Sequence, residues 1–226
     1  MKIAFITHAI GVGGGSLSSS KTIQYLIEKK LLIPDQCIII HQGRQQPSTE
    51  KNDVYFNLKK SIMCYQCKLP FSLAYKGSPS YKHAIYYEIY RYILLTYITL
   101  YFFISFNKIL KKERISVVHL NSLVLWPLLL VLPKQMKKIV HIREPPNELI
   151  EGKIAVFIMK RYATKIISID YITNSMFKDS DKSVVIMNPF DMRMARSLRQ
   201  KKNILKKQFT INPETFIISI IGRIED

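Results

Sequence analysis

The chain has 226 residues, 48% of them hydrophobic, and a formal net charge of +18 at pH 7. An apolar content of this size with only 8 glycines and 10 prolines argues against a disordered chain and favours a packed core. The charge predicts an anionic partner, which means nucleic acid, anionic lipid or a phosphorylated substrate, and it carries no information about the fold.

Cysteine usage and the first residues favour a reducing compartment. Three cysteines cannot pair evenly, and "MKIAFITHAI" at 1–10 has one lysine and a short apolar run without the cleavage site of a secretory signal. These features predict a cytoplasmic protein. Cys64 and Cys67 form a C-x-x-C pair, but a zinc site would need a second pair, and only Cys37 and scattered histidines remain. We therefore expect ordinary thiols and no metal.

Apolar, β-rich runs alternate with segments of helical spacing along the chain. Most runs lack polar alternation, which suits strands buried on both faces of a parallel sheet. The expected strands are 2–7, 36–42, 115–120, 137–143, 164–169, 183–187 and 215–222. The expected helices are 16–30, 83–112, 122–132, 152–163 and 170–178. This alternation predicts an α/β fold with a doubly wound, mostly parallel, Rossmann-like sheet.

Two segments interrupt the alternation. The first, 44–82, is polar and contains glycines and prolines, so we expect a long irregular excursion. The second, 83–114, is rich in aromatic residues, and its uncharged centre is shorter than the ~20 residues that span a bilayer. It is interpreted as a buried helix of the domain or, because it ends in Lys108, Lys111, Lys112 and Arg114, as a helix that lies on a membrane.

The stretch "GGGSLSSSKT" at 13–22 follows the first expected strand and opens the first expected helix. A P-loop would place Lys21 and Thr22 correctly but has Ser20 where its second glycine belongs. A dinucleotide fingerprint from Gly11 would end in serine, and no acidic residue follows the second expected strand. The remaining interpretations are a flexible turn and, favoured here, an anion-binding helix start with Ser16 as the N-cap.

Five further segments, together with the glycine stretch, resemble the N-terminal half of a retaining GT-B glycosyltransferase of the family 4 kind. They are "ISVVHLNS" at 115–122, "KKIVHIREPP" at 137–146, "KIISIDYITNSMF" at 165–177, "SVVIMNPFD" at 183–191 and "FIISIIGRIED" at 216–226. The order matches that family over nearly the whole chain. On this resemblance, 1–208 is the acceptor-side domain, and 209–226 begins a second, donor-binding domain.

The resemblance implies transfer of a sugar from a nucleotide-diphosphate donor to a glycan or lipid-linked acceptor, with retained configuration, in cell-surface polysaccharide synthesis. It implies neither metal nor cofactor, and we assign no general base. The residues implied for the donor phosphates or sugar are Gly13, Gly14, Gly15, Ser16 and Arg223. Those implied for the acceptor side are His119, Asn121, Arg143 and Glu144. Simpler roles remain open for several of these. His119 could be a histidine that ends a strand without contacting the acceptor, Asn121 could cap the next helix, and Glu144 could form a surface ion pair with Arg143.

Two departures from the family pattern limit what the chain is expected to do alone. Arg143 stands where many relatives carry a histidine, and an arginine holds a phosphate or carboxylate but is no base near neutral pH. The family's Lys-Gly and paired-glutamate motifs do not follow Arg223 within the 226 residues. The isolated chain is therefore expected to be incomplete as an enzyme.

The basic stretch at 193–208 is either a solvated helix face or a surface for anionic lipid or a lipid-linked pyrophosphate. With the aromatic helix, it predicts a peripheral position at the inner face of the plasma membrane. Two other classes remain as alternatives: a P-loop-like nucleotide-binding protein and a basic nucleic-acid-binding protein. No nucleic-acid motif is present and the basic residues are dispersed, so no nucleic acid is expected as a partner.

Overall fold

The computed structural model describes residues 1–8, 14–42, 53–67, 85–148 and 150–188, and a few positions after 205. The chain divides into two compact units, Met1–Asn188 and Pro189–Asp226. The first unit carries all of the structure discussed below. The expected strand at 215–222 and most of the basic stretch at 193–208 lie outside the described residues, and a domain boundary at residue 208 stays a prediction.

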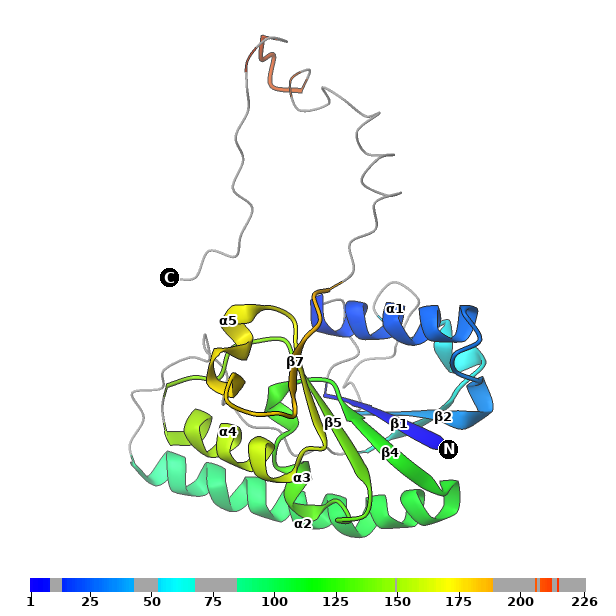
Figure 1. The fold of residues 1–226 in the computed structure, drawn as a ribbon, viewed down its shortest axis with the longest axis vertical. Helices are drawn as coiled ribbons and strands as arrows, with labels where there is room; N and C mark the ends of the chain where they lie inside the picture. The colour runs from blue at the N-terminus through cyan, green and yellow to red at the C-terminus, as the bar shows by residue number, and fades with distance from the viewer. Residues whose placement is uncertain are drawn as a thin grey trace. The chain divides into compact units, whose positions relative to one another are not determined.

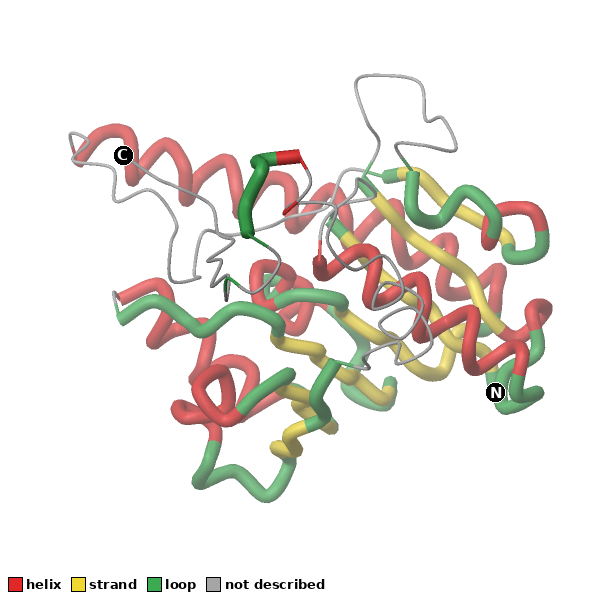
Figure 2. The backbone as a smooth tube through the Cα atoms, turned by 90° about the horizontal axis from the view of Figure 1, so that it is seen from above, coloured by secondary structure: helices red, strands yellow, loops and turns green. Residues whose placement is uncertain are grey.

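The first unit is built on one sheet of seven parallel strands in the order β3-β2-β1-β4-β5-β6-β7 (Figures 1 and 2). The strands are β1 Lys2–Thr7, β2 Cys37–His41, β3 Met63–Gln66, β4 Ile115–Leu120, β5 Lys137–Ile142, β6 Lys165–Ser168 and β7 Ser183–Val185. The predicted doubly wound α/β fold is confirmed. One strand was not predicted, because β3 lies inside 44–82, where we expected irregular structure.

The helices are α1 Gly14–Glu28, α2 Ile85–Glu113, α3 Leu128–Val131, α4 Ile150–Tyr162 and α5 Tyr171–Asn174. Short 3-10 turns form at Pro34–Gln36, Leu58–Lys60, Leu123–Leu125 and Ser175–Phe177. The expected helix 122–132 is therefore broken, and α3 begins only after Pro127, a residue that cannot donate a helical hydrogen bond. Ser16 is not the N-cap of α1, because the helix begins two residues earlier.

The core lies on both faces of the sheet, because alternate residues of a strand point to opposite sides. Ala4 and Ile6 of β1 pack in one cluster with side chains of α2, α3 and α4, whereas Phe5 packs in a second cluster with Ile23 of α1. Figure 1 shows α2, α3 and α4 below the sheet and α1 above it. In α2, Phe106 and Leu110 are buried while the opposite side of the helix is exposed, so α2 is half-buried and not a fully buried helix.

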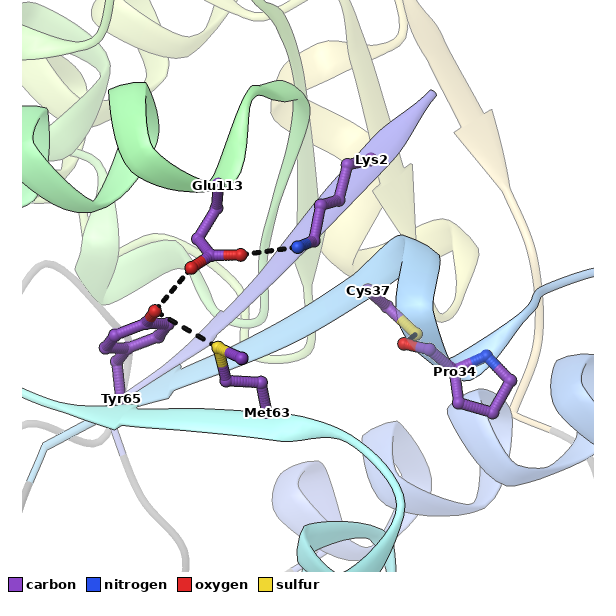
Figure 3. A network of polar contacts seen from close by, with 6 residues as sticks. All are labelled: Lys2, Pro34, Cys37, Met63, Tyr65 and Glu113. Atoms are coloured by element: carbon purple, nitrogen blue, oxygen red, sulfur yellow. Dashed lines mark hydrogen bonds and ion pairs between the residues drawn. The ribbon is translucent and has the colours of Figure 1, made fainter.

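A polar network ties α2 to the amino-terminal edge of the sheet (Figure 3). Glu113, the last residue of α2, forms an ion pair with Lys2 of β1 and accepts a hydrogen bond from the Tyr65 hydroxyl of β3 at 2.6 Å. Met63 Sδ lies 3.1 Å from that hydroxyl oxygen. Three elements that are far apart in the sequence are thus joined, and the edge strand β3 is fixed at one of its ends.

The C-x-x-C pair of the sequence consists of free thiols. Burial raises the pKa of Cys64 to about 11 and that of Cys67 to about 12, so both remain protonated at neutral pH. The described residues contain no group of three or more histidine, cysteine or acidic side chains that is placed to hold a metal ion. Nor does any described helix have the length and apolarity to cross a membrane.

Candidate functional site

The predicted acceptor-side residues gather where the strand order reverses, at the carboxyl ends of β1, β4 and β5. β1 pairs with β2 on one side and with β4 on the other, and this reversal is the place where open α/β sheets bind ligands. Asn121 follows the last residue of β4, and Arg143 and Glu144 follow the last residue of β5. Gly15, in the first turn of α1, lies at the same edge.

The guanidinium of Arg143 forms the centre of the site. Its Nε donates to Asn121 Oδ1 at 2.9 Å, and one terminal nitrogen donates to Asn188 Oδ1 at 3.0 Å. The other terminal nitrogen lies 3.4 Å from His141 Nδ1. We call Arg143, Asn121, His141 and Asn188 the arginine network. All three hydrogen-bond partners are neutral. Burial lowers the pKa of Arg143, and the nearby Tyr55 and Glu144 oppose that change, although no ion pair to Arg143 forms within the described residues.

Gly15, in the first turn of α1, lies directly against this network. Asn121 Nδ2 donates to the Gly15 carbonyl at 3.4 Å, and a Cβ added at Gly15 would lie 3.0 Å from Arg143 Cδ. That distance is tighter than most real Cβ contacts, so a side chain at this position would push against the arginine. The glycine therefore has a packing role: it lets the Arg143 chain approach the positive end of the helix.

Asn188 joins the site from the opposite direction along the chain. It is the last residue of the first unit, and its Oδ1 also accepts a hydrogen bond from Ser18 Oγ of α1 at 2.9 Å. One amide oxygen thus links α1, β5 and the segment after β7. In the sequence, Asn188 belongs to "SVVIMNPFD" at 183–191, and it was not among the predicted site residues.

His119 and His141 form an imidazole pair beside Arg143. The ring centroids are 5.6 Å apart in an edge-to-face arrangement, and His119 also lies 5.4 Å from the ring of Phe5. Burial, and then the neighbouring positive charge of Arg143, lower the pKa of His119 to about 4 and that of His141 to about 3. Both rings are therefore neutral at pH 7.

Each ring keeps one buried nitrogen, Nδ1 of His119 and Nε2 of His141, that makes no hydrogen bond within the described residues. His141 was missed in the sequence, although its spacing is informative. His119 in β4 and Asn121 just after it are two residues apart, as are His141 in β5 and Arg143 just after it. This period places all four side chains on the α1 side of the sheet.

Glu144 does not pair with Arg143 as a surface ion pair. The only ion pairs between described residues are Lys2–Glu113 and Lys59–Asp53. Glu144 is half-buried, and its Oε2 has no hydrogen-bond partner in the described part of the chain. Burial raises the pKa of this carboxyl, and the positive charge of Arg143 opposes the rise only in part.

The structure brings together some of the predicted residues and leaves others untested. His119, Asn121, Arg143 and Gly15 meet at one site, with Glu144 next to Arg143 in the chain. Ser16 is buried in the first turn of α1, which Gly14 opens. Gly13 and Arg223 lie outside the described residues. Asn121 does not cap the next helix: the Ser122 side chain does, by accepting a hydrogen bond from Val124 N.

The position of Lys21 weighs against a P-loop. In that motif the lysine lies beside the start of the helix, where the phosphates bind. Here α1 begins at Gly14, so Lys21 is exposed nearly two turns, ~10 Å, further along the helix.

No family model matches the chain, and no curated protein matches it. Among solved structures, HepE of Anabaena in complex with UDP and glucose matches with a TM-score of 0.51 and 14% identity over 89% of this chain and 50% of HepE. The apo form of the lipopolysaccharide outer core galactosyltransferase WaaB matches with a TM-score of 0.52 and 18% identity, over 85% of this chain and 47% of WaaB.

The chain thus spans about half the length of the structures it matches. At these identities the likeness concerns the fold and leaves substrates open. It agrees with the seven-stranded parallel sheet. The chain has the Rossmann-like α/β fold of one half of a GT-B glycosyltransferase.

Proposed function

We propose that this chain is the acceptor-side half of a retaining glycosyltransferase that moves a sugar from a nucleotide-diphosphate donor to a glycan or lipid-linked acceptor, in cell-surface polysaccharide synthesis. One observation carries the proposal: the buried guanidinium of Arg143, which forms no ion pair within the described residues, is held by neutral hydrogen-bond partners against the start of α1 at the strand reversal. A buried cation among neutral partners favours an anionic ligand. The HepE complex with UDP-glucose supports a nucleotide sugar as the donor class.

The reaction needs stabilisation of charge more than it needs a base. The bond from the sugar's anomeric carbon to the diphosphate breaks, its electron pair leaves with the nucleoside diphosphate, and the acceptor oxygen bonds to the same carbon on the same face. The hydroxyl proton is released to solvent, and we assign no side chain as its base. The growing negative charge would be met by the positive end of α1, which begins at Gly14, and the resemblance also implies Gly13 and Arg223 in this role.

The acceptor side is assigned to His119, Asn121, Arg143 and Glu144. The neutral imidazole of His119 can donate to or accept from a hydroxyl without adding charge, and Arg143 can hold a phosphate or a carboxylate. An acceptor with a lipid pyrophosphate would be presented at the cytoplasmic face of the plasma membrane, so peripheral contact with an anionic membrane belongs to this proposal.

Arg143→Lys tests the proposal. A lysine keeps the charge, but its ammonium cannot span Asn121, His141 and Asn188 with the planar geometry of a guanidinium. We expect the binding of inorganic pyrophosphate, the charged group of a lipid-linked acceptor, to weaken by about tenfold, measured by calorimetry or by ligand-observed NMR. The matched control is Arg161→Lys on the exposed side of α4, which should bind as wild type does.

Two results would contradict the proposal. One is the absence of pyrophosphate binding by the wild-type chain. The other is equal binding by wild type and Arg143→Lys when circular dichroism shows that both are folded.

A further inference from the structure

The outer side of α4 carries an apolar line. Ile150, Ile154 and Phe157 are exposed, Phe157 at 66%, and they follow one another at spacings of four and three residues, which places them on one side of the helix. Ala155 and Met159, which are fully buried, point to the sheet from the opposite side. Nothing in the arrangement of α4 on the sheet requires three large apolar side chains on its outer side.

The outer side of α2 carries a similar line. Ile93, Tyr97, Leu100 and Ile104 are exposed, Tyr97 at 67% and Ile104 at 63%, again at spacings of three and four residues. At 100° per residue this line is opposite the side on which Phe106 and Leu110 enter the core.

The two lines face the same way. α2 and α4 both pack in the core cluster on one side of the sheet, and α3 contacts both of them. Figure 1 shows the three helices as one layer, with α1 on the other side of the sheet. Since each line points away from the sheet, both belong to one outer surface, which we call the helical face. An exposed surface with seven large apolar side chains marks an interaction site.

The charges on the helical face are of one sign. Lys108, Lys111 and Lys112 of α2 are exposed, as are Lys153 and Arg161 of α4. The acidic residues of the two helices whose exposure is described, Glu113 and Glu151, are both buried. Apolar and aromatic side chains beside lysines and arginines are the composition of helices that lie in the interface of an anionic bilayer.

We propose that the helical face docks on an anionic lipid bilayer, with the apolar lines of α2 and α4 in the interface and the basic residues against the headgroups. The inference deepens the proposed function and rests on it, because docking would bring the site to a lipid-linked acceptor. The physical contact itself requires neither donor nor transfer. One surface formed by two helices gives a fixed orientation on the membrane, which a single helix could not do.

The test is co-sedimentation of the full chain with vesicles of phosphatidylcholine, with and without phosphatidylglycerol. We expect binding to the anionic vesicles, weakened by salt. The double variants Ile154→Ser/Phe157→Ser on α4 and Tyr97→Ser/Ile104→Ser on α2 should each lower the partition coefficient by about tenfold. The matched control is Tyr25→Ser, which removes an exposed aromatic ring of α1 on the other side of the sheet and should leave binding unchanged.

Each outcome decides the inference, provided that circular dichroism shows the variants to be folded. Equal binding by wild type and by both double variants overturns it, as does wild-type indifference to phosphatidylglycerol. A wild-type dimer that becomes monomeric in the variants, without vesicle binding, overturns it in favour of contact between two copies. The pyrophosphate binding of the same variants is measured in parallel, because its retention separates a failure of docking from a failure of the proposed function.

Discussion

At the scale of single residues, Arg143 determines the electrostatics of the site. Its positive charge adds to the burial that lowers the pKa values of His119 and His141, and it opposes the rise in the pKa of Glu144. The two rings can therefore serve as neutral hydrogen-bonding groups at physiological pH, and protonating either one in the folded protein would place two cations side by side.

The lowered pKa values predict a loss of stability in acid. In the unfolded chain a histidine takes up its proton near pH 6.5, whereas folded His119 does so only near pH 4. Between these values the unfolded state binds more protons, so the free energy of unfolding falls as pH falls, by up to about 1.4 kcal/mol per pH unit for each such group. The raised pKa of Glu144 has the opposite effect, because it makes the free energy of unfolding rise as pH falls. Wild type and variants must therefore be compared over the same pH range.

His119→Phe removes this titration and keeps an aromatic ring against Phe5. We expect a shallower dependence of the unfolding free energy on pH between about 6.5 and 4 than in wild type, measured by urea denaturation at several pH values. An unchanged slope would show that His119 is not held neutral by burial and by Arg143.

At the scale of elements, what the sequence predicts depends on how far apart the interacting residues lie. The six strands from β1 to β7 other than β3 are apolar runs, so each was predictable from its own residues. β3 is only "MCYQ", without an apolar run, and it is fixed by parallel pairing to β2 and by the contact of Tyr65 with Glu113, 48 residues away. Contacts of this kind leave no local signal.

The same limit applies to the candidate site. His119, Asn121 and Arg143 were predictable because they end apolar runs, and the ends of parallel strands meet at one edge. Ser18 and Asn188 were missed because they are 170 residues apart and meet only through the packing of α1 beside the segment after β7.

The network at the opposite edge of the sheet gives a prediction at this scale. Glu113→Gln removes the carboxylate from Lys2 and weakens the hydrogen bond from Tyr65, so we expect the free energy of unfolding to fall by about 1–3 kcal/mol. Combined with Tyr65→Phe, the loss should be smaller than the sum of the two single losses by at least about 0.5 kcal/mol, measured in a double-mutant cycle with urea. Lys111→Gln, at an exposed position in the same turn of α2, is the control and should change little. Strict additivity of the two changes would show that the contact contributes nothing to stability.

At the scale of the whole molecule, the seven strands, both core clusters and the arginine network all lie within Met1–Asn188. Asn188 is both the last residue of that unit and a partner of Arg143, so the unit ends with a residue of the candidate site. A cut after Asn188 leaves every described strand pairing and every contact of the arginine network in place, whereas a cut before β7 removes the edge partner of β6 and one acceptor of Arg143.

We therefore expect residues 1–188 to unfold in one cooperative step, with a free energy within about 1 kcal/mol of the full chain. A chain cut after Asp181 should be clearly less stable, because β6 becomes an unpaired edge and the guanidinium of Arg143 loses the amide oxygen of Asn188. Trp126, the single tryptophan, is buried in the core and reports unfolding by its fluorescence in all three chains. If 1–188 unfolds at much lower urea than the full chain, the residues after 188 contribute to the first unit, and the candidate site would need them to form.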